Sequence, residues 1–397
     1  MTPSRVLAWG VWAIASLFYA YQYILRVMPN ILLDDIMHRF DIGTVAFGQF
    51  SGVYYVGYAL MQLPLGMMLD RFGPRKVMTG SILVSVLGLL PLIFADFWIY
   101  PIVGRLLIGM GSSGAILGVF KIIRMTFSET RFPRMLSFSV MIGLLGAIYG
   151  GAPVSAMRDA MGYEAVIEVL AAAGLLLALI TYIVVPQMQG ERQRSLASDL
   201  KEVLGNRYVL MTCFFAGLMV GPLEGFADVW GTAFLKQIYG LDKMVSASLP
   251  SLIFIGMCFG APLLNLIAER VGNYLLTIAG AGFAMALSFT LFLSWELSPS
   301  AIGANFILIG IGSAYQILAI YKASTYVPAS VAGLTTAAAN MIIMVFGYAF
   351  HSIIGGVINL TGNLVYGIAV VPLALFIGTA GFFFLWAQER RVRVEGS

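Results

Sequence analysis

Charged side chains are scarce in this sequence: Asp, Glu, Lys and Arg together make up 11% of its 397 residues. Soluble domains carry roughly 25%, so the composition excludes an ordinary globular protein. Hydrophobic residues account for 60%, and uncharged runs of about 20 residues recur, the length that a helix needs to cross a bilayer. The runs are continuous rather than alternating, which favours helices over the strands of a barrel. We therefore expect an all-α membrane protein.

Cysteine and histidine are nearly absent, with two of each in the chain. Cys213 and Cys258 both fall in expected membrane spans, so we expect neither a disulfide framework nor a metal site. The two histidines are far apart, and no serine–base pairing is visible. We therefore expect no enzyme activity and no cofactor. The net charge of +4 does not indicate nucleic acid, because the basic residues gather at the ends of spans.

Twelve membrane spans are expected from the apolar runs. The first run is too long for the core of a signal peptide and has no cleavage site after it, so we interpret it as a retained span. The expected spans are 7–30, 45–67, 77–96, 99–122, 136–156, 164–185, 208–234, 246–267, 274–294, 300–322, 332–355 and 364–387.

The longest polar stretch lies between the sixth and seventh spans. It divides the chain into an N-terminal half (1–186), a central cytoplasmic loop (187–207) and a C-terminal half (208–397). Most of the 23 lysines and arginines then lie on the side of the two termini. Cytoplasmic loops are enriched in basic residues, so both termini are expected to be cytoplasmic.

The two halves resemble each other in sequence. IGMGSSGAILGVFK (108–121) aligns without gaps to IGIGSAYQILAIYK (309–322), with seven of fourteen positions identical. At nearly the same offset, LDRFG (69–73) aligns with AERVG (268–272). This spacing indicates duplication of a six-span unit, a plan that many secondary transporters share.

The loop after the second span reads GMMLDRFGPRKV (66–77). It resembles the major facilitator superfamily signature G-x-x-x-D-R-x-G-R-[RK], with Pro74 and Arg75 in place of Gly-Arg, and NLIAERVG (265–272) stands where that family has a degenerate second copy. The resemblance implies twelve transmembrane helices in two pseudo-symmetric six-helix halves. It also implies a conformational latch. The latch residues would be Gly66, Asp70, Arg71, Gly73, Arg75, Lys76, Glu269 and Arg270.

Gly66 is expected to allow close approach of a helix. In GRLLIGMG (104–111), Arg105 matches the arginine that this family carries in its fourth span. The resemblance links that residue to proton coupling, and a role in helix packing is an equal alternative. Drug antiporters of the family carry G-P-x-x-G-G in the fifth span. Here that span reads GLLGAIYGGAPVSA (143–156), without a Gly-Pro pair, which counts against multidrug efflux.

Arg26 lies inside the otherwise uncharged first span. A charge at the centre of a membrane helix costs roughly 2.5–3.5 kcal/mol on insertion scales, so such residues normally face a partner or a cavity. One interpretation is an outward-reaching side chain that meets Asp34 or Asp35. The other is an anchor for an anionic group of a substrate, because the guanidinium binds carboxylate or phosphate through two parallel hydrogen bonds. The YILRVMP segment (23–29) resembles the organic-anion and organophosphate branches of the family, which place an arginine there.

The seventh span contains GPLEGFADVWG (221–231), with Glu224 and Asp228 four residues apart and thus on one face of an α-helix. Burial and mutual repulsion would favour a protonated acid, so Glu224 and Asp228 are candidates for proton coupling. The alternatives are a structural ion pair with Arg26 or Arg105, or exposure at the outer end of the span.

Polar and aromatic residues on the spans that line the cavity in this family are the candidate substrate contacts. With Arg26 they are Gln22, Tyr23, Tyr54, Tyr58, Tyr315, Gln316 and Asn340. We therefore expect a proton-coupled symporter that moves a small polar solute, anionic or zwitterionic, across the inner membrane by alternating access. The expected partners are the solute, protons and membrane lipid, and the protein is expected to be a monomer.

Two alternatives remain open. Within transport, the protein could export amphiphilic drugs or siderophore-like metabolites. Outside transport, a receptor or scaffold with the same spans would look similar, although it would need neither Arg26 and Arg105 nor the paired acids.

Overall fold

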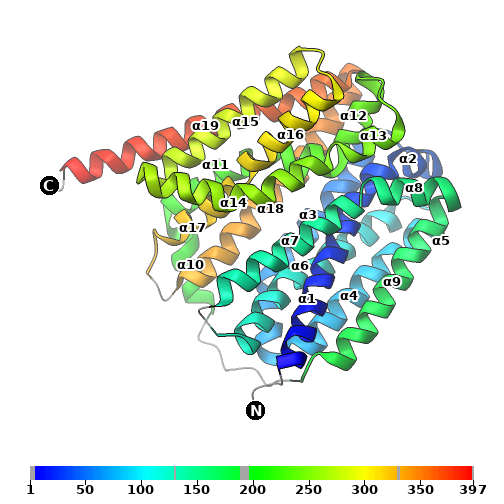
Figure 1. The fold of residues 1–397 in the computed structure, drawn as a ribbon, viewed down its shortest axis with the longest axis horizontal. Coiled ribbons are helices and arrows are strands. Elements are labelled where there is room, and N and C mark those ends of the chain that lie inside the picture. The colour runs from blue at the N-terminus through cyan, green and yellow to red at the C-terminus, as the bar shows by residue number, and fades with distance from the viewer. Residues whose placement is uncertain (1–4, 129–130, 188–195, 329–330, 396–397) are drawn as a thin grey trace. The chain divides into compact units, whose positions relative to one another are not determined.

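The computed structural model describes residues 5–128, 131–187, 196–328 and 331–395. The side chains of some further residues inside helices, Asp70 among them, lie outside the described part. The chain divides into two compact units, Met1–Arg194 and Ser195–Ser397. Every regular element in the described ranges is a helix (Figure 1), as expected for a chain whose apolar runs must satisfy their own backbone in lipid.

The first unit consists of helices α1 to α9 (Figure 1). Their bounds are α1 Arg5–Ile31, α2 Leu33–Phe40, α3 Thr44–Phe72, α4 Pro74–Leu89, α5 Pro91–Phe94, α6 Ile99–Thr126, α7 Phe132–Tyr149, α8 Ala152–Met161 and α9 Tyr163–Val184.

The described part of the second unit contains ten further helices and one element with π-helical hydrogen bonding, labelled η2. In chain order they are α10 Leu196–Gly205, α11 Arg207–Leu218, η2 Gly221–Trp230, α12 Gly231–Ile238, α13 Lys243–Ser248, α14 Ser251–Val271, α15 Tyr274–Ser294, α16 Pro299–Ser313, α17 Tyr315–Ser324, α18 Ala332–Thr361 and α19 Leu364–Glu395. The central segment that was expected to be a loop therefore contains a short helix, α10.

Ten helical segments of the described chain are long and apolar enough to cross a membrane. They correspond to the third to twelfth expected spans. The first two expected spans are helical as well, as α1 and α3, with 27 and 29 residues. Both are rich in tyrosine and glutamine, which makes them less apolar than the other ten.

Several expected spans are interrupted rather than continuous. The fifth span breaks between α7 and α8 at Gly150 and Gly151, and Pro153 lies in the first turn of α8. The tenth breaks at Ala314, between α16 and α17. Proline is tolerated in the first turn of a helix, because the amide hydrogens of that turn have no partner within the helix and proline lacks one. Sequence hydrophobicity does not resolve such breaks, because apolar residues lie on both sides of each one.

Equivalent helices pack together in both units. In the first, α3 packs on α6, α4 on α9, and α1 on α7; in the second, α14 packs on α16, α15 on α19, and α11 on α18. Two aligned glycines make the tightest of these contacts. A Cβ at Gly109 would lie 2.0 Å from the carbonyl oxygen of Tyr54, and one at Gly310 would lie 2.0 Å from that of Ile253. The repeated IG-x-G sequence thus serves backbone-to-backbone packing.

Candidate functional site

Arg26 is buried in the first unit, on α1. Its guanidinium carbon lies 5.1 Å from the ring centre of Tyr23 and 5.3 Å from that of Tyr55 on α3. Aromatic faces attract a cation, more strongly where water is excluded. The charge that looked costly in the sequence is therefore placed against two tyrosine rings.

A second buried arginine holds the backbone beneath Arg26. Arg105 of α6 donates from Nη1 to the carbonyl oxygen of Leu25 at 2.6 Å and from Nη2 to that of Arg26 at 2.9 Å. Pro29 lies inside α1 and has no amide hydrogen, so it removes the helical donor that the carbonyl of Leu25 would otherwise have. Arg105 supplies this missing donor. The packing role that was the alternative for this residue is therefore visible in the structure.

The candidate substrate residues of α1 and α3 lie together around Arg26. The Tyr54 hydroxyl donates to Gln22 Oε1 at 2.7 Å, and the Tyr54 and Tyr58 rings are 6.0 Å apart. The Tyr58 hydroxyl is near enough to Arg26 to interact with it electrostatically. All five predicted contacts of the first unit (Gln22, Tyr23, Arg26, Tyr54 and Tyr58) thus form one cluster.

Two further residues complete this cluster. Tyr19 packs edge to face on Tyr23, with ring centres 5.2 Å apart. Gln62 of α3 is buried beside the Tyr58 hydroxyl, and its Nε2 makes no well-aligned hydrogen bond to any described group. A four-residue spacing from Tyr54 through Tyr58 to Gln62 is the signal in the sequence that places Gln62 on the same face.

The candidate substrate residues of the second unit do not form a comparable cluster. The Tyr315 hydroxyl donates to the carbonyl oxygen of Ala216 at 2.6 Å, and thus ties α17 to the end of α11. Gln316, next to it, is buried, and its Nε2 has no hydrogen-bond partner among the described residues. Asn340 is half-buried on α18. Tyr315 therefore has a packing role that the sequence did not indicate.

Glu224 and Asp228 lie on η2, a π-helix, and not on the α-helix that their four-residue spacing was taken to imply. All ten residues of η2 are buried, and the two acids are 1% and 0% exposed. π-Helical segments are rare and occur mostly at functional sites. Glu224 is close enough to Tyr315 to interact with it electrostatically.

An aromatic cluster fixes η2 in place. Phe226 contacts four phenylalanine rings edge to face, with ring centres 5.4–6.0 Å apart. Edge-to-face pairs of this kind stabilise a core beyond the area they bury. The four rings are Phe234, Phe289, Phe292 and Phe306.

The loop expected to act as a latch is a tight connection between α3 and α4. Gly73 has a φ of 78°, a conformation that favours glycine, and Pro74 begins α4. Arg75 donates from Nε to the carbonyl oxygen of Val185 at 2.5 Å and packs over the Tyr182 ring, which ties the loop to the end of α9. The loop is therefore anchored within its own unit.

The other predicted latch residues are less constrained. Arg71, Lys76, Glu269 and Arg270 are exposed. The side chain of Asp70 lies outside the described part of the structure. A Cβ at Gly66 would meet no described atom within 4 Å, so no helix of its own unit makes the close approach expected there.

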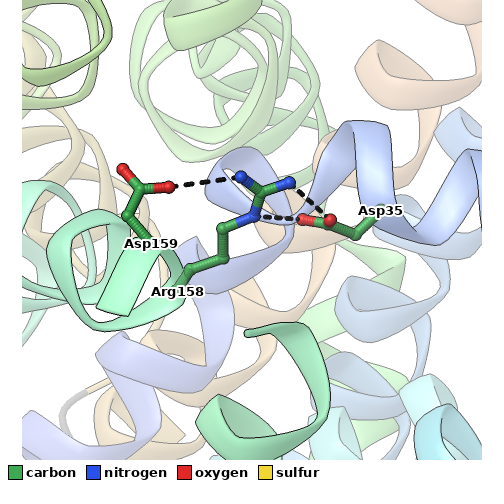
Figure 2. Close-up of polar contacts among 3 residues, drawn as sticks. All are labelled: Asp35, Arg158 and Asp159. Atoms are coloured by element: carbon green, nitrogen blue, oxygen red, sulfur yellow. Dashed lines mark hydrogen bonds and ion pairs between the residues drawn. The ribbon is translucent and has the colours of Figure 1, made fainter. Parts of the chain in front are cut away.

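Sequence reasoning missed an ion-pair network at the other end of the first unit (Figure 2). Arg158 of α8 binds Asp35 of α2 through two hydrogen bonds of 2.6 and 2.9 Å, and contacts Asp159 at 3.2 Å. Arg39 of α2 pairs with Glu164 of α9 at 2.7 Å and also donates to the carbonyl of Ile93. Asp35, considered as a partner for Arg26, is thus bound by Arg158.

A second missed network lies in the other unit. Lys322 Nζ lies 2.6 Å from Glu389 Oε1 on α19, and the Tyr326 hydroxyl donates to the same oxygen at 2.6 Å. Within the described ranges, no group of three or more His, Cys, Asp or Glu is placed to hold a metal ion. In this unit, as in the first, some charged side chains near span ends form ion pairs.

Comparisons with known proteins agree with this architecture. Residues 11–351 match the sequence profile of the family described as Major Facilitator Superfamily. The Bacillus subtilis protein named "Probable galactarate/D-glucarate transporter GudP" is 21% identical, over 89% of this chain and 86% of its own length. The Acinetobacter baumannii "Quinolone resistance transporter" is 20% identical, over 89% of this chain and 88% of its own.

A solved structure has the same fold. The bacterial homologue of the human lysosomal transporter Spinster, in an inward-facing and unoccupied conformation, superimposes with a TM-score of 0.70. The alignment covers 96% of each chain at 16% sequence identity, so the likeness concerns the fold.

Proposed function

The chain belongs to the major facilitator superfamily, and from this premise we propose that it is a proton-coupled carrier of a small organic acid. As a member of this family it is a multi-pass membrane transporter of small-molecule solutes rather than an enzyme. The solute is anionic or zwitterionic, and alternating access of the carrier moves it across the inner membrane.

The observation that supports an anionic solute best is the buried Arg26 within its tyrosine cluster. A guanidinium placed over two rings keeps its charge at every physiological pH and directs N–H groups along its edge. A carboxylate can accept two parallel hydrogen bonds there. The relative named for galactarate and glucarate fits this chemistry.

Proton coupling is assigned to the acids of η2. Glu224 and Asp228 are both buried on a π-helical segment, and such segments occur mostly at functional sites. A carboxyl that gains and loses a proton as its surroundings change can couple transport to the proton gradient. Arg105 contributes by fixing the backbone of α1 next to Arg26.

The loop at 66–76, with Glu269 and Arg270 at the equivalent position, is proposed as the conformational latch on the cytoplasmic side. Both termini then lie in the cytoplasm, and the protein works as a monomer surrounded by lipid. The excess of lysine and arginine on that side supports this orientation.

Efflux of amphiphilic drugs or siderophore-like metabolites is the second candidate, because one relative is named for quinolone resistance. The absence of a Gly-Pro pair from the fifth span counts against drugs. The choice depends on whether solute recognition needs Arg26.

A thermal-shift screen of the purified protein tests the proposal, because a ligand that binds the folded state raises the melting temperature. The compounds are monocarboxylates, dicarboxylates, sugar phosphates, amino acids and quinolones. The variants are Arg26→Ala, Arg26→Lys and, as a matched control, Arg207→Ala, which removes an exposed arginine. We expect anionic compounds to raise the melting temperature of the wild-type protein and of Arg207→Ala, but not that of either Arg26 variant. Quinolone hits that are unchanged in Arg26→Ala would instead support efflux.

A further inference from the structure

The seventh expected span is broken between α11 and η2, immediately before its two acids. The amide of Met219 donates to the carbonyl oxygen of Ala216 at 3.0 Å, three residues back rather than the four of an α-helix. The next amide, that of Val220, has the same spacing and donates to Gly217 at 3.3 Å. Pro222, in the first turn of η2, lacks the amide hydrogen with which an α-helix would continue. The last turn of α11 is therefore tightened and separated from η2.

Tyr315 binds the end of α11 at this break. Its hydroxyl donates to the carbonyl oxygen of Ala216 at 2.6 Å, and the side chain is 1% exposed. Tyr315 is itself the first residue of α17, directly after the interruption of the tenth span at Ala314. One buried hydrogen bond therefore joins the interruptions of two spans.

The first unit uses a different residue for the equivalent task. There Arg105 donates to carbonyl oxygens of α1 in the turn before Pro29. When the alignment of the two halves is extended back by three positions, Arg105 matches Phe306, which packs on the Phe226 ring at 5.5 Å and has no side-chain donor. The second unit obtains its donor from Tyr315, at another position of the equivalent span. Both units thus supply a side-chain donor to a helix that a proline interrupts.

The break also determines where Glu224 lies. The amide of Glu224 donates to the carbonyl oxygen of Val220, within the break, at 2.9 Å. Glu224 is also near enough to Tyr315 to interact with it electrostatically. The proton affinity of a buried carboxyl group depends on the polar groups around it. Movement of the end of α11 relative to η2 would therefore change both the position of Glu224 and its polar surroundings.

Other titratable groups lie on η2 and on the helices packed against it, which are α12, α14, α16, α18 and α19. Within the described ranges, the buried or half-buried ones are Asp228, Cys258, Tyr348, His351 and Glu389. A test must therefore resolve the protonation of Glu224 from that of its neighbours.

We propose that Tyr315 is a positioning residue for proton coupling. Its hydrogen bond to Ala216 holds the break in the seventh span, and thereby links the protonation of Glu224 to the relative position of α11 and α17. This inference rests on the proposed function, since it assumes that Glu224 binds and releases the coupled proton.

Infrared difference spectroscopy of the full-length protein in lipid tests this role without any solute. The C=O stretching band of protonated carboxylic acids is recorded against pH, and the component that disappears in Glu224→Gln belongs to Glu224. Asp228→Asn identifies the component of the other acid in the same way. In Tyr315→Phe, the midpoint of the Glu224 component is expected to move by roughly half a pH unit or more, the effect of one changed hydrogen bond.

Two further variants separate this role from ordinary packing. Tyr21→Phe is the matched control, because it removes a buried hydroxyl that donates to the carbonyl oxygen of Leu170 at 2.9 Å in the first unit. Its melting temperature should fall about as far as that of Tyr315→Phe, while the midpoint of the Glu224 component stays at the wild-type value. Pro222→Ala restores an amide hydrogen to the broken span and should also move the midpoint, which keeps the test decisive if Tyr315→Phe does not fold.

The outcomes distinguish this inference from the proposed function. A wild-type midpoint in every folded variant of Tyr315 and Pro222, or an equal shift in Tyr21→Phe, would overturn the positioning role and leave Glu224 as a coupling acid. If Asp228 alone changes protonation, this inference fails while proton coupling through Asp228 stands. If neither acid changes protonation, the proton-coupling part of the proposed function fails, and this inference fails with it.

Discussion

Arg105 donates a 2.6 Å hydrogen bond to the carbonyl oxygen of Leu25, the group that Pro29 leaves without its helical donor. A proline in a membrane helix is tolerated when a neighbouring group satisfies the carbonyl that it frees. Here that group is a charged side chain from another helix, and the freed carbonyl lies next to Arg26. The irregular point of α1 and the candidate anion anchor are therefore held by one residue.

Replacing Arg105 should cost stability in proportion to the carbonyls that it satisfies. Arg105→Met leaves the oxygen of Leu25 without a donor, at about 1–3 kcal/mol for a buried group, and removes the additional donor to the oxygen of Arg26. In a Pro29→Ala background the helix can supply its own donor to Leu25, so Arg105→Met should be less harmful there. A double-mutant cycle of melting temperatures measures this coupling. Additive effects would show that Arg105 does not compensate for Pro29.

The aligned glycines Gly109 and Gly310 should not tolerate alanine. In each case the new Cβ would lie 2.0 Å from a backbone oxygen, and overpacking of this kind costs about 1–3 kcal/mol or more. Gly80→Ala and Gly280→Ala are matched controls, because a Cβ at either position meets nothing within 4 Å. The controls should be neutral or slightly stabilising. Equal melting temperatures for Gly109→Ala and Gly80→Ala would contradict the packing described here.

The Arg158–Asp35 pair should contribute only modestly to stability. Its side chains are 32% and 19% exposed, so solvent screens the interaction, and Asp35→Asn should cost up to about 1 kcal/mol. The loss should shrink at high salt. Asp159→Asn is the control, because this acid makes the longer contact and is 49% exposed. A larger loss of stability for Asp159→Asn than for Asp35→Asn would contradict the assignment of Asp35 as the stronger partner of Arg158 in Figure 2.

Among the residues of η2 other than its two acids, Phe226 should cause the largest loss of stability when it is truncated to alanine. Phe226→Ala removes the ring that four phenylalanines contact, and truncation of a buried phenylalanine typically costs about 3–5 kcal/mol. Phe259→Ala, at a position 64% exposed on α14, should have little effect. Thermal unfolding in detergent compares the two. A mild effect at Phe226 would mean that other contacts hold the π-helix.

The sequence predicted the helical membrane fold well because apolar runs of a fixed length are what a bilayer requires. The sequence also predicted that one site would contain Gln22, Tyr23, Arg26, Tyr54 and Tyr58, since their spacing along two helices is regular. It did not predict the π-helix at Glu224, because hydrophobic periodicity does not report the hydrogen-bonding pattern of a buried segment.

Long-range pairs were the other gap. Asp35 and Arg158 are separated by 123 positions, and Asp35 was considered only as a partner for Arg26 until the fold placed it beside Arg158. Arg105 was likewise known as a charge within a span, but its acceptors are backbone oxygens that no side-chain pattern records.

The crossings at Gly109 and Gly310 also bear on how the protein can move. Where a glycine meets a carbonyl of the facing helix, there is no side chain that could change rotamer to let the helices slide. The two helices of each pair, α3 with α6 and α14 with α16, should therefore move together as one rigid body during a transport cycle. Spin labels on the two helices of a pair should keep a constant separation whichever side of the membrane the carrier faces.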